Sequence, residues 1–300
     1  MRYAIIDIGS NTVKMTLYDE TVMLRKYSQS VYLLSYVENG MLNPAGIEAL
    51  CRVLTAYRTV ALREQARLFA YATASLRGLS NQAEILNTVT ALLSIDIDVI
   101  SGEEEARLSL RGIAVASGID TDSKPFFDLG GGSLEVVLPT PSGLLASSFA
   151  LGALKTYLGF VKNVLPTESE LRAIYRHAKG LFEEAALIPT NADDALAVGG
   201  TLRAVCTLLA NEKGEEYDEN KPFTVTRQDA VSLLQRIASL DHTTKLVMLE
   251  KIPQRIHTVA PGLSVFVALL DTLSLTTFTV VSGGVREGYL EKIIKKEDGI

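Results

Sequence analysis

Two short segments of this 300-residue chain share one pattern: an apolar run, an aspartate, a turn of glycine and serine, and a second strand-forming run. The first is Asp7-Ile8-Gly9-Ser10-Asn11-Thr12 and the second is Asp128-Leu129-Gly130-Gly131-Gly132-Ser133. Each predicts a β-hairpin whose tip presents backbone N–H groups and hydroxyls beside a carboxylate. Glycines let such donors approach an anion closely, while an acidic oxygen holds a divalent cation. Because the pattern occurs twice, it predicts a duplicated fold with a phosphate-binding loop in each half.

The two halves match at two further places. Ala74-Ser75-Leu76-Arg77 follows a predicted strand in the first half, and Gly200-Thr201-Leu202-Arg203 follows one in the second. Ser101-Gly102-Glu103 likewise corresponds to Ser282-Gly283-Gly284. Three loop types that recur in the same order predict an internal duplication, in which a β-hairpin is followed by alternating helices and strands.

The polar segment 117–125 is the predicted boundary between two domains, and a plausible hinge. We assign residues 1–120 to the first domain and 121–284 to the second, and expect a C-terminal helix over about 285–300 to pack back on the first. The predicted strands cover 3–6, 13–18, 68–72, 95–100, 126–127, 134–138, 195–198 and 277–281. The predicted helices of the first half cover 44–67, 80–93 and 101–116, and Asn43 with Pro44 opens the earliest of them.

Composition narrows the class of protein. With a formal net charge of −6, the chain has no overall positive potential that would attract nucleic acid. A phosphorylated ligand therefore needs a local cluster of cations. Cys51 and Cys206 lack metal-ligand spacing and read as reduced thiols of a cytoplasmic protein. No signal peptide is evident, and Pro261 and Asp271 interrupt the apolar region 259–281. We therefore expect a buried helix and strand there, and a cytoplasmic protein that binds neither membrane nor nucleic acid.

Ligands of α/β sheets bind beyond the carboxyl ends of the strands, where all of these loops should lie. Asp7 and Asp128 are then expected to face each other across a cleft. Lys14 follows the first loop and reaches either a phosphate or solvent. The expected phosphate-binding residues of the two loops are Gly9, Ser10, Asn11, Gly130, Gly131, Gly132 and Ser133.

Three consecutive acids, Glu103, Glu104 and Glu105, begin the predicted helix after Ser101. A capping box between Ser101 and Glu104, with carboxylates at the positive helix end, explains them without any catalysis. Successive helical residues point about 100° apart, so the three cannot all face one ligand. The strand before this helix ends at the same cleft, where one carboxylate could take a proton from a water and direct it at phosphorus. The pattern does not say which of the three does so.

Three arginines follow predicted strands, where a guanidinium pairs with phosphate oxygens in bidentate fashion. Arg77 and Arg286 are the favoured phosphate ligands, and Arg203 is expected to be a surface charge. The three histidines of the chain show no partner pattern, so no histidine metal site is predicted.

Six motifs in this order resemble those of the exopolyphosphatase/guanosine pentaphosphate phosphohydrolase (Ppx/GppA) family. They are Asp7-Ile8-Gly9-Ser10-Asn11, Thr73-Ala74-Ser75-Leu76-Arg77, Ser101-Gly102-Glu103-Glu104-Glu105-Ala106-Arg107, Asp128-Leu129-Gly130-Gly131-Gly132-Ser133-Leu134-Glu135, Gly199-Gly200-Thr201 and Gly284-Val285-Arg286-Glu287-Gly288. The resemblance implies an α/β fold of the duplicated actin-like ATPase, Hsp70 and sugar kinase type (ribonuclease H-like), with a central interdomain cleft. It also implies the short form of the family, without the C-terminal HD-type extension.

The resemblance implies roles for single residues. Glu105 matches the general base of the family, which activates the attacking water. Asp128 and Glu135 match acidic positions associated with the divalent cation, Mg²⁺ or another, and Asp7 lies beside them at the first phosphate loop. Arg77 matches an arginine that contacts the phosphate chain.

The implied activity is that of a phosphoanhydride hydrolase, which releases terminal phosphate from inorganic polyphosphate or the 5′ γ-phosphate from guanosine pentaphosphate. Two alternatives remain open. One is an ATP-binding kinase or ATPase of the same superfamily, with Gly199-Gly200-Thr201 near an adenosine. The other is a non-catalytic sensor of polyphosphate or an alarmone. The apolar helices of the second half suggest a homodimer.

Overall fold

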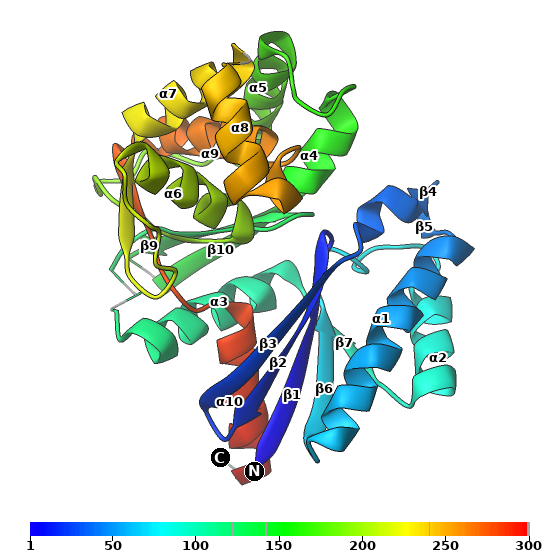
Figure 1. The fold of residues 1–300 in the computed structure, drawn as a ribbon. Coiled ribbons are helices and arrows are strands. Elements are labelled where there is room, and N and C mark those ends of the chain that lie inside the picture. Colours follow the sequence, from blue (N-terminus) through cyan, green and yellow to red (C-terminus); the bar gives the residue numbers. More distant parts are fainter. Residues whose placement is uncertain (120, 122, 142, 240, 299–300) are drawn as a thin grey trace.

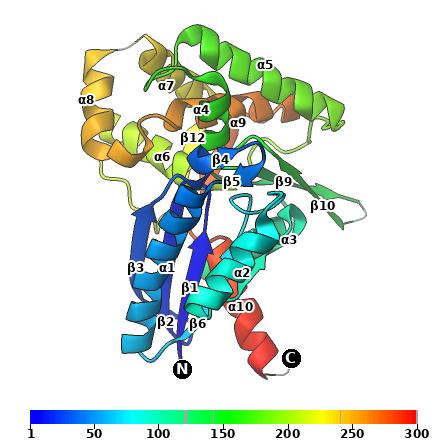
Figure 2. The same ribbon diagram turned by 90° about the vertical axis from the view of Figure 1, so that its right-hand side faces the viewer.

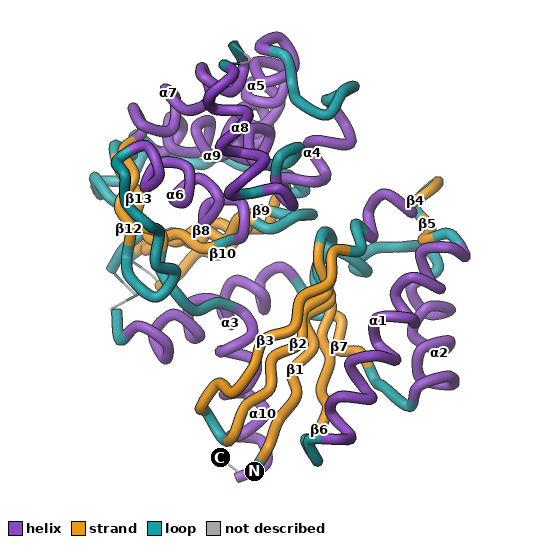
Figure 3. The backbone as a smooth tube through the Cα atoms, in the orientation of Figure 1, coloured by secondary structure: helices purple, strands orange, loops and turns teal. Residues whose placement is uncertain are grey.

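Two α/β units face each other in the computed structural model, which describes residues 1–119, 121, 123–141, 143–239 and 241–298 (Figure 1). Each unit has its own sheet, and each sheet begins with antiparallel hairpins and continues with parallel strands. In each unit the strands form a layer that helices cover (Figure 3). The repeated order of hairpin, helix and strand expected from the sequence is therefore present.

The first sheet has the strand order β3-β2-β1-β6-β7. The N-terminal strands β1 (Arg2–Ile8), β2 (Thr12–Asp19) and β3 (Val22–Ser30) pair antiparallel with one another in this order. The strands β6 (Arg67–Ala72) and β7 (Ile97–Val99) continue the sheet in parallel to β1. This arrangement places the β1–β2 loop and the ends of β6 and β7 at one edge of the sheet.

Both faces of β1 are buried, which explains its unbroken apolar sequence. Ala4 and Ile6 lie in the core beneath α1 (Pro44–Arg63) and α2 (Gln82–Leu93). Ile5 lies on the other face, against α10 (Val285–Asp298). Figure 2 shows the two early helices on one side of the sheet and α10 on the other. The connection from β3 to α1 contains a 3-10 turn, Leu33–Tyr36, and the short strands β4 (Val37–Glu38) and β5 (Met41–Leu42).

The second sheet has the strand order β10-β9-β8-β11-β13-β12. Its antiparallel part is β8 (Phe126–Leu129), β9 (Leu134–Thr140) and β10 (Gly143–Phe149), its parallel part adds β11 (Leu196–Val198) and β13 (Thr277–Val280), and β12 (Phe223–Thr226) is an antiparallel edge strand. One face carries α4 (Ala153–Phe160), α5 (Glu168–Glu184), α6 (Gly200–Glu212), α7 (Arg227–Ala238), α8 (His242–Lys251), the 3-10 turn Pro253–Arg255 and α9 (Val259–Leu273).

The helix α3 (Gly102–Ser117) lies between the two units and packs on both (Figure 1). Its residue Ile113 belongs to a cluster on the second sheet, whereas Leu108 packs in a cluster with α10 and β1. A Cβ at Gly288 of α10 would overlap the carbonyl oxygen of Leu108 in α3, so the two helices touch backbone to backbone. The division at 120/121 stays a prediction, and Asp120 and Asp122 of the predicted hinge lie outside the described residues.

Local sequence signals explain several helix starts. The Asn43 side chain accepts a hydrogen bond from the Gly46 N–H at 2.9 Å, as a helix cap should. The Ser101 hydroxyl accepts from the Glu104 N–H at 3.1 Å, but the Glu104 carboxylate accepts from Lys292 Nζ, so only half of the predicted capping box forms. The strands β3 and β12, together with the two-residue strands β4 and β5, were not predicted.

No helix in the described part of the chain is long and apolar enough to cross a membrane. The helix α9 has 15 residues and is almost entirely buried. The apolar region around it therefore forms a core helix followed by β13, as the sequence predicts.

Candidate active site

The two aspartate-glycine loops have the same internal hydrogen bond. In the first, the Gly9 N–H donates to the Thr12 carbonyl at 3.2 Å. In the second, the Gly130 N–H donates to the Ser133 carbonyl at 3.0 Å. Each bond closes a tight turn between two antiparallel strands, so both predicted hairpins are present.

The loops of the two halves touch each other. A Cβ at Gly132 would lie 2.5 Å from Ser10 Oγ and 2.9 Å from the Cβ of Ala74. A Cβ at Gly131 would lie 3.3 Å from the Cβ of Asn11. Glycine is therefore required in the second loop because it allows a close approach of the first loop.

Replacing Gly132 with alanine is expected to destabilise the fold by about 1–3 kcal/mol, because the new methyl group overpacks the contact with Ser10 and Ala74. The free energy of unfolding, measured in urea, checks this. Gly180 is the matched control, since it lies inside α5 with open space at its Cβ position. Gly180→Ala should leave stability unchanged or raise it by up to about 1 kcal/mol. Equal effects of the two substitutions would contradict the close approach.

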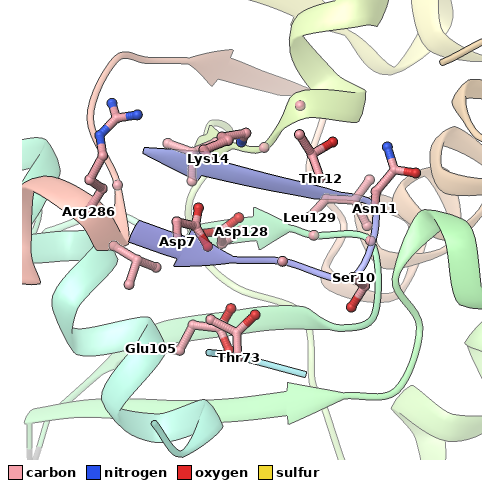
Figure 4. Close-up of a pocket in the computed structure, with 18 of the residues that line it drawn as sticks. Asp7, Ser10, Asn11, Thr12, Lys14, Thr73, Glu105, Asp128, Leu129 and Arg286 are labelled. Carbon is pink, nitrogen blue, oxygen red and sulfur yellow. The ribbon is translucent and has the colours of Figure 1, made fainter. Parts of the chain in front are cut away.

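A central cavity of about 140 Å³ lies between the loops (Figure 4). It is large enough for several groups of the size of water. Twelve residues predicted from the sequence line it: Asp7, Gly9, Ser10, Asn11, Lys14, Glu105, Asp128, Gly130, Gly131, Gly132, Ser133 and Arg286. Two others, Arg77 and Glu135, do not line it.

Asp7 and Asp128 lie next to each other in this cavity (Figure 4). Burial raises the pKa of Asp7 above its ordinary value, although Lys14 and Arg286 lower it. Burial also raises the pKa of Asp128, and the charge of Asp7 adds to this, although the Ser109 hydroxyl donates to its carboxylate at 2.7 Å. Two mutually repelling, poorly solvated carboxylates create a strong local preference for a cation.

This pair fits Mg²⁺, which commonly takes one or two carboxylates and completes its shell with water and phosphate oxygens. A protein-only cage is not present: among the residues that the structure describes, no group of three His, Cys, Asp or Glu side chains could hold a metal ion. Glu135, the third predicted ligand, pairs with Asp128 across β8 and β9 but is fully buried outside the cavity. It accepts a hydrogen bond from the Ser148 hydroxyl at 2.8 Å.

Burial and the charge of Asp128 raise the pKa of Glu135 to about 7. The unfolded chain has the ordinary, lower pKa, so the folded protein binds more protons between about pH 4.5 and pH 7. Stability of the metal-free protein should therefore fall as the pH rises through this window. Glu135→Gln is expected to flatten that fall, which urea unfolding in a chelator at several pH values would measure. An unchanged slope would contradict the raised pKa.

Glu105 is the single member of the acidic triplet that faces the cavity. Its side chain is 8% exposed, whereas Glu103 is exposed and pairs with Arg107, and Glu104 is partly exposed and pairs with Lys292. Burial raises the pKa of Glu105 well above its ordinary value, and the nearby carboxylates of Glu135 and Asp128 add to the shift. A carboxylate with a raised pKa is a stronger base than an exposed one.

Arg77 holds Glu105 in place. Its guanidinium Nη1 lies 3.0 Å from Glu105 Oε2 and donates to the Ile100 carbonyl at 3.2 Å. Its other terminal nitrogen lies 3.7 Å from Glu135 Oε1. Arg77, the predicted phosphate ligand, thus contacts the two buried glutamates, and it lines a separate cavity together with Lys155.

Four cations surround the central cavity: Lys14, Arg203, Arg255 and Arg286. Lys14 stands opposite Asp7 in the β1–β2 pairing. Burial lowers the pKa of Lys14 to about 8, although Asp7 raises it. Arg286 forms an ion pair of 2.5 Å with Glu287. This cluster compensates locally for the negative charge of the whole chain.

Sequence reasoning missed two of these cations. Arg203 was expected at the surface, but the first turn of α6 places it at the cavity. Its position after Gly199-Gly200, in the loop that matches Arg77, was the signal that could have found it. Arg255 lies in the short turn after Pro253, with its guanidinium against Gly200, and no motif marks it.

The sequence pattern of the Ppx/GppA phosphatase family matches residues 20–297. A curated relative, the guanosine-5'-triphosphate,3'-diphosphate pyrophosphatase of Photobacterium profundum, is 26% identical over 310 residues. The match covers 98% of this chain and 59% of the relative, so the chain spans less than two thirds of that protein's length.

Solved structures show the same fold. An exopolyphosphatase from Cytophaga hutchinsonii gives a TM-score of 0.85 at 19% identity, with 100% of this chain and 99% of the other covered. A Ppx/GppA family member from Aquifex aeolicus gives 0.76 at 23% identity, with 99% of each chain covered. The two-domain actin-like α/β fold and the resemblance found in the motifs are thus confirmed. Because the family pattern covers most of its length, the chain belongs to the Ppx/GppA phosphatase family.

Proposed function

We propose that the protein hydrolyses phosphoanhydrides, and that it releases the terminal phosphate of inorganic polyphosphate or the 5′ γ-phosphate of guanosine pentaphosphate. The observation that carries this proposal is the position of Glu105. Its buried carboxylate faces a cavity that also contains the Asp7–Asp128 pair and both phosphate loops. A water held at Glu105 is then next to the place where a phosphoryl group would bind.

In the proposed in-line hydrolysis, different residues bind the phosphate, hold the cation and activate the water. The backbone N–H groups and hydroxyls of the two loops bind the terminal phosphoryl group, and the surrounding cations balance its charge. Asp7 and Asp128 would hold Mg²⁺, which supplies charge neutralisation at the phosphoryl oxygens when bound. Glu105 takes a proton from the attacking water. Arg77 fixes the direction of that carboxylate.

The relatives support this choice of substrates. The name of the Photobacterium profundum relative refers to a pyrophosphatase that acts on guanosine-5'-triphosphate,3'-diphosphate, and the Cytophaga hutchinsonii structure is that of an exopolyphosphatase. Both substrates carry a terminal phosphoanhydride, which is the bond that this site is suited to break. The homodimer and the cytoplasmic location stay predictions.

Phosphate release by the purified full chain tests the proposal. Polyphosphates of several lengths, guanosine pentaphosphate and ATP are offered separately with Mg²⁺, and a chelator provides the blank. We expect Mg²⁺-dependent release from polyphosphate or guanosine pentaphosphate. Tight ATP binding without release from these substrates would instead support a kinase, and binding of polyphosphate without any release would support a sensor.

A further inference from the structure

A second cavity, of about 460 Å³, adjoins the central one. The two cavities share a wall that consists of Lys14, Arg203, Gly283, Arg286 and Glu287. Three of these five residues, Lys14, Arg203 and Arg286, are cationic. A ligand that extends from the central cavity past these residues therefore enters the larger second cavity through an entrance that is lined by cations.

The second cavity lies between the two halves of the molecule. One wall is the face of β2 and β3 that carries Lys14, Thr16 and Lys26, since Thr16 and Lys26 are directly paired. The opposite wall includes Arg203 and Glu219 of the second half. Lys26 Nζ and Glu219 Oε1 form an ion pair of 2.9 Å across the space, with side chains 40% and 48% exposed.

Two buried polar atoms on these walls have no hydrogen-bond partner among the described residues. They are Thr16 Oγ1, in a side chain that is fully buried, and Arg203 Nε. A buried donor without a partner is costly, so such atoms point to a ligand that supplies acceptors. Phosphoryl oxygens are acceptors of this kind, and they also match the cations of the shared wall.

The direction of attack leads to the same cavity. Figure 4 shows Glu105 on one side of Asp7 and Asp128, and Lys14 on the other. In an in-line displacement the attacking water and the leaving oxygen stand on opposite sides of the phosphorus. A water held at Glu105 therefore drives the leaving group toward Lys14.

We propose that the second cavity binds the leaving group, an anion with at least two phosphoryl groups, between Lys14, Arg203 and Lys26. The oxygen of the water forms a bond to the terminal phosphorus while its proton goes to Glu105. The bond from that phosphorus to the bridging oxygen breaks, and the electron pair stays on the leaving anion beside Lys14. The direction of this step depends on the proposed hydrolysis, whereas the binding of the anion does not.

The test uses two substitutions that change charge in opposite ways. Lys26→Gln removes a cation from the cavity, and Glu219→Gln removes the carboxylate that competes for it. Inorganic pyrophosphate and guanosine diphosphate are the probes, because both present two phosphoryl groups and only one carries a nucleoside. Calorimetry on the full chain with Mg²⁺ should show roughly fivefold weaker binding for Lys26→Gln and tighter binding for Glu219→Gln, for at least one probe.

Another result is expected if the Lys26–Glu219 ion pair only holds the two halves together and does not affect the binding of an anion. Both substitutions break the same contact between the two halves, so they would then shift binding in the same direction. That outcome, or parental affinity of Lys26→Gln for both probes, overturns the proposal. Lys124→Gln is the matched control, since Lys124 pairs with Asp194 at 2.8 Å with similar exposure and lies outside the three cavities described.

Failure of the proposed hydrolysis gives a different signature. If the chain releases no phosphate from any substrate but the two variants still shift probe binding in opposite directions, the hydrolase assignment fails and the anion site stands. If phosphate is released but the opposite shifts are missing, the hydrolase assignment stands and the anion site fails.

Discussion

Glu105→Gln is expected to lower the rate of phosphate release by about 100- to 10,000-fold, because glutamine cannot accept the proton of the attacking water. Substrate binding should change little, since the loops and the cations of the cavity remain. Measuring kcat and KM with the preferred substrate separates the two effects, and the loss is expected in kcat.

Glu103→Gln is the matched control for this substitution. Glu103 lies in the same helical turn, but it is exposed and pairs with Arg107, so its loss should leave kcat at the parental value. Parental activity of Glu105→Gln would show that another group takes the proton. Equal losses in the two variants would indicate that the charge of the helix start matters, and not the position of one carboxylate.

Asp128→Asn is expected to lower Mg²⁺-dependent activity by at least about 100-fold, because the site loses one of the two carboxylates that we propose to hold the cation. The same substitution should raise the thermal midpoint of the metal-free protein. Burial already raises the pKa of Asp128, which means that its charged form destabilises the folded state at neutral pH. Activity at a series of Mg²⁺ concentrations and thermal unfolding in a chelator test both effects.

Asp19→Asn serves as the control, since Asp19 is exposed at the end of β2. It should change neither the Mg²⁺ dependence nor, by more than a little, the thermal midpoint. A drop in the thermal midpoint of the Asp128 variant would show that the carboxylate stabilises the fold through its hydrogen bond with Ser109. It would contradict the prediction that Asp128 supports activity but destabilises the metal-free fold.

The sequence was sufficient to predict the duplicated sheets and both loops, because a strand, an acid and a glycine turn form a local pattern that repeats. Glu105 is a different case. Helical geometry showed that the three glutamates cannot all face one ligand, but only the resemblance to the family selected Glu105 as the general base. In the structure, the turn of α3 that buries Glu105 at the cavity leaves Glu103 exposed and Glu104 partly exposed, and the catalytic role of Glu105 stays a prediction.

Long-range packing explains what the sequence could not predict. Arg77 is bonded to Glu105, 28 positions further along the chain, and no local pattern predicts that partner. Arg255 reaches the cavity because a turn of the second half packs against Gly200. The edge strands β3 and β12 were missed for another reason, since neither has the long apolar run that marks a buried strand: most of β3 is exposed, and in the four-residue β12 only Val225 is fully buried.

The contact between Gly132 and Ser10 has a consequence for the history of the chain. After a duplication, two copies normally accumulate substitutions independently. Here a larger side chain in one loop is tolerated only if the facing loop becomes smaller. The two halves therefore share one evolutionary constraint at their tips, and a substitution in one copy should be rescued by a compensating substitution in the other.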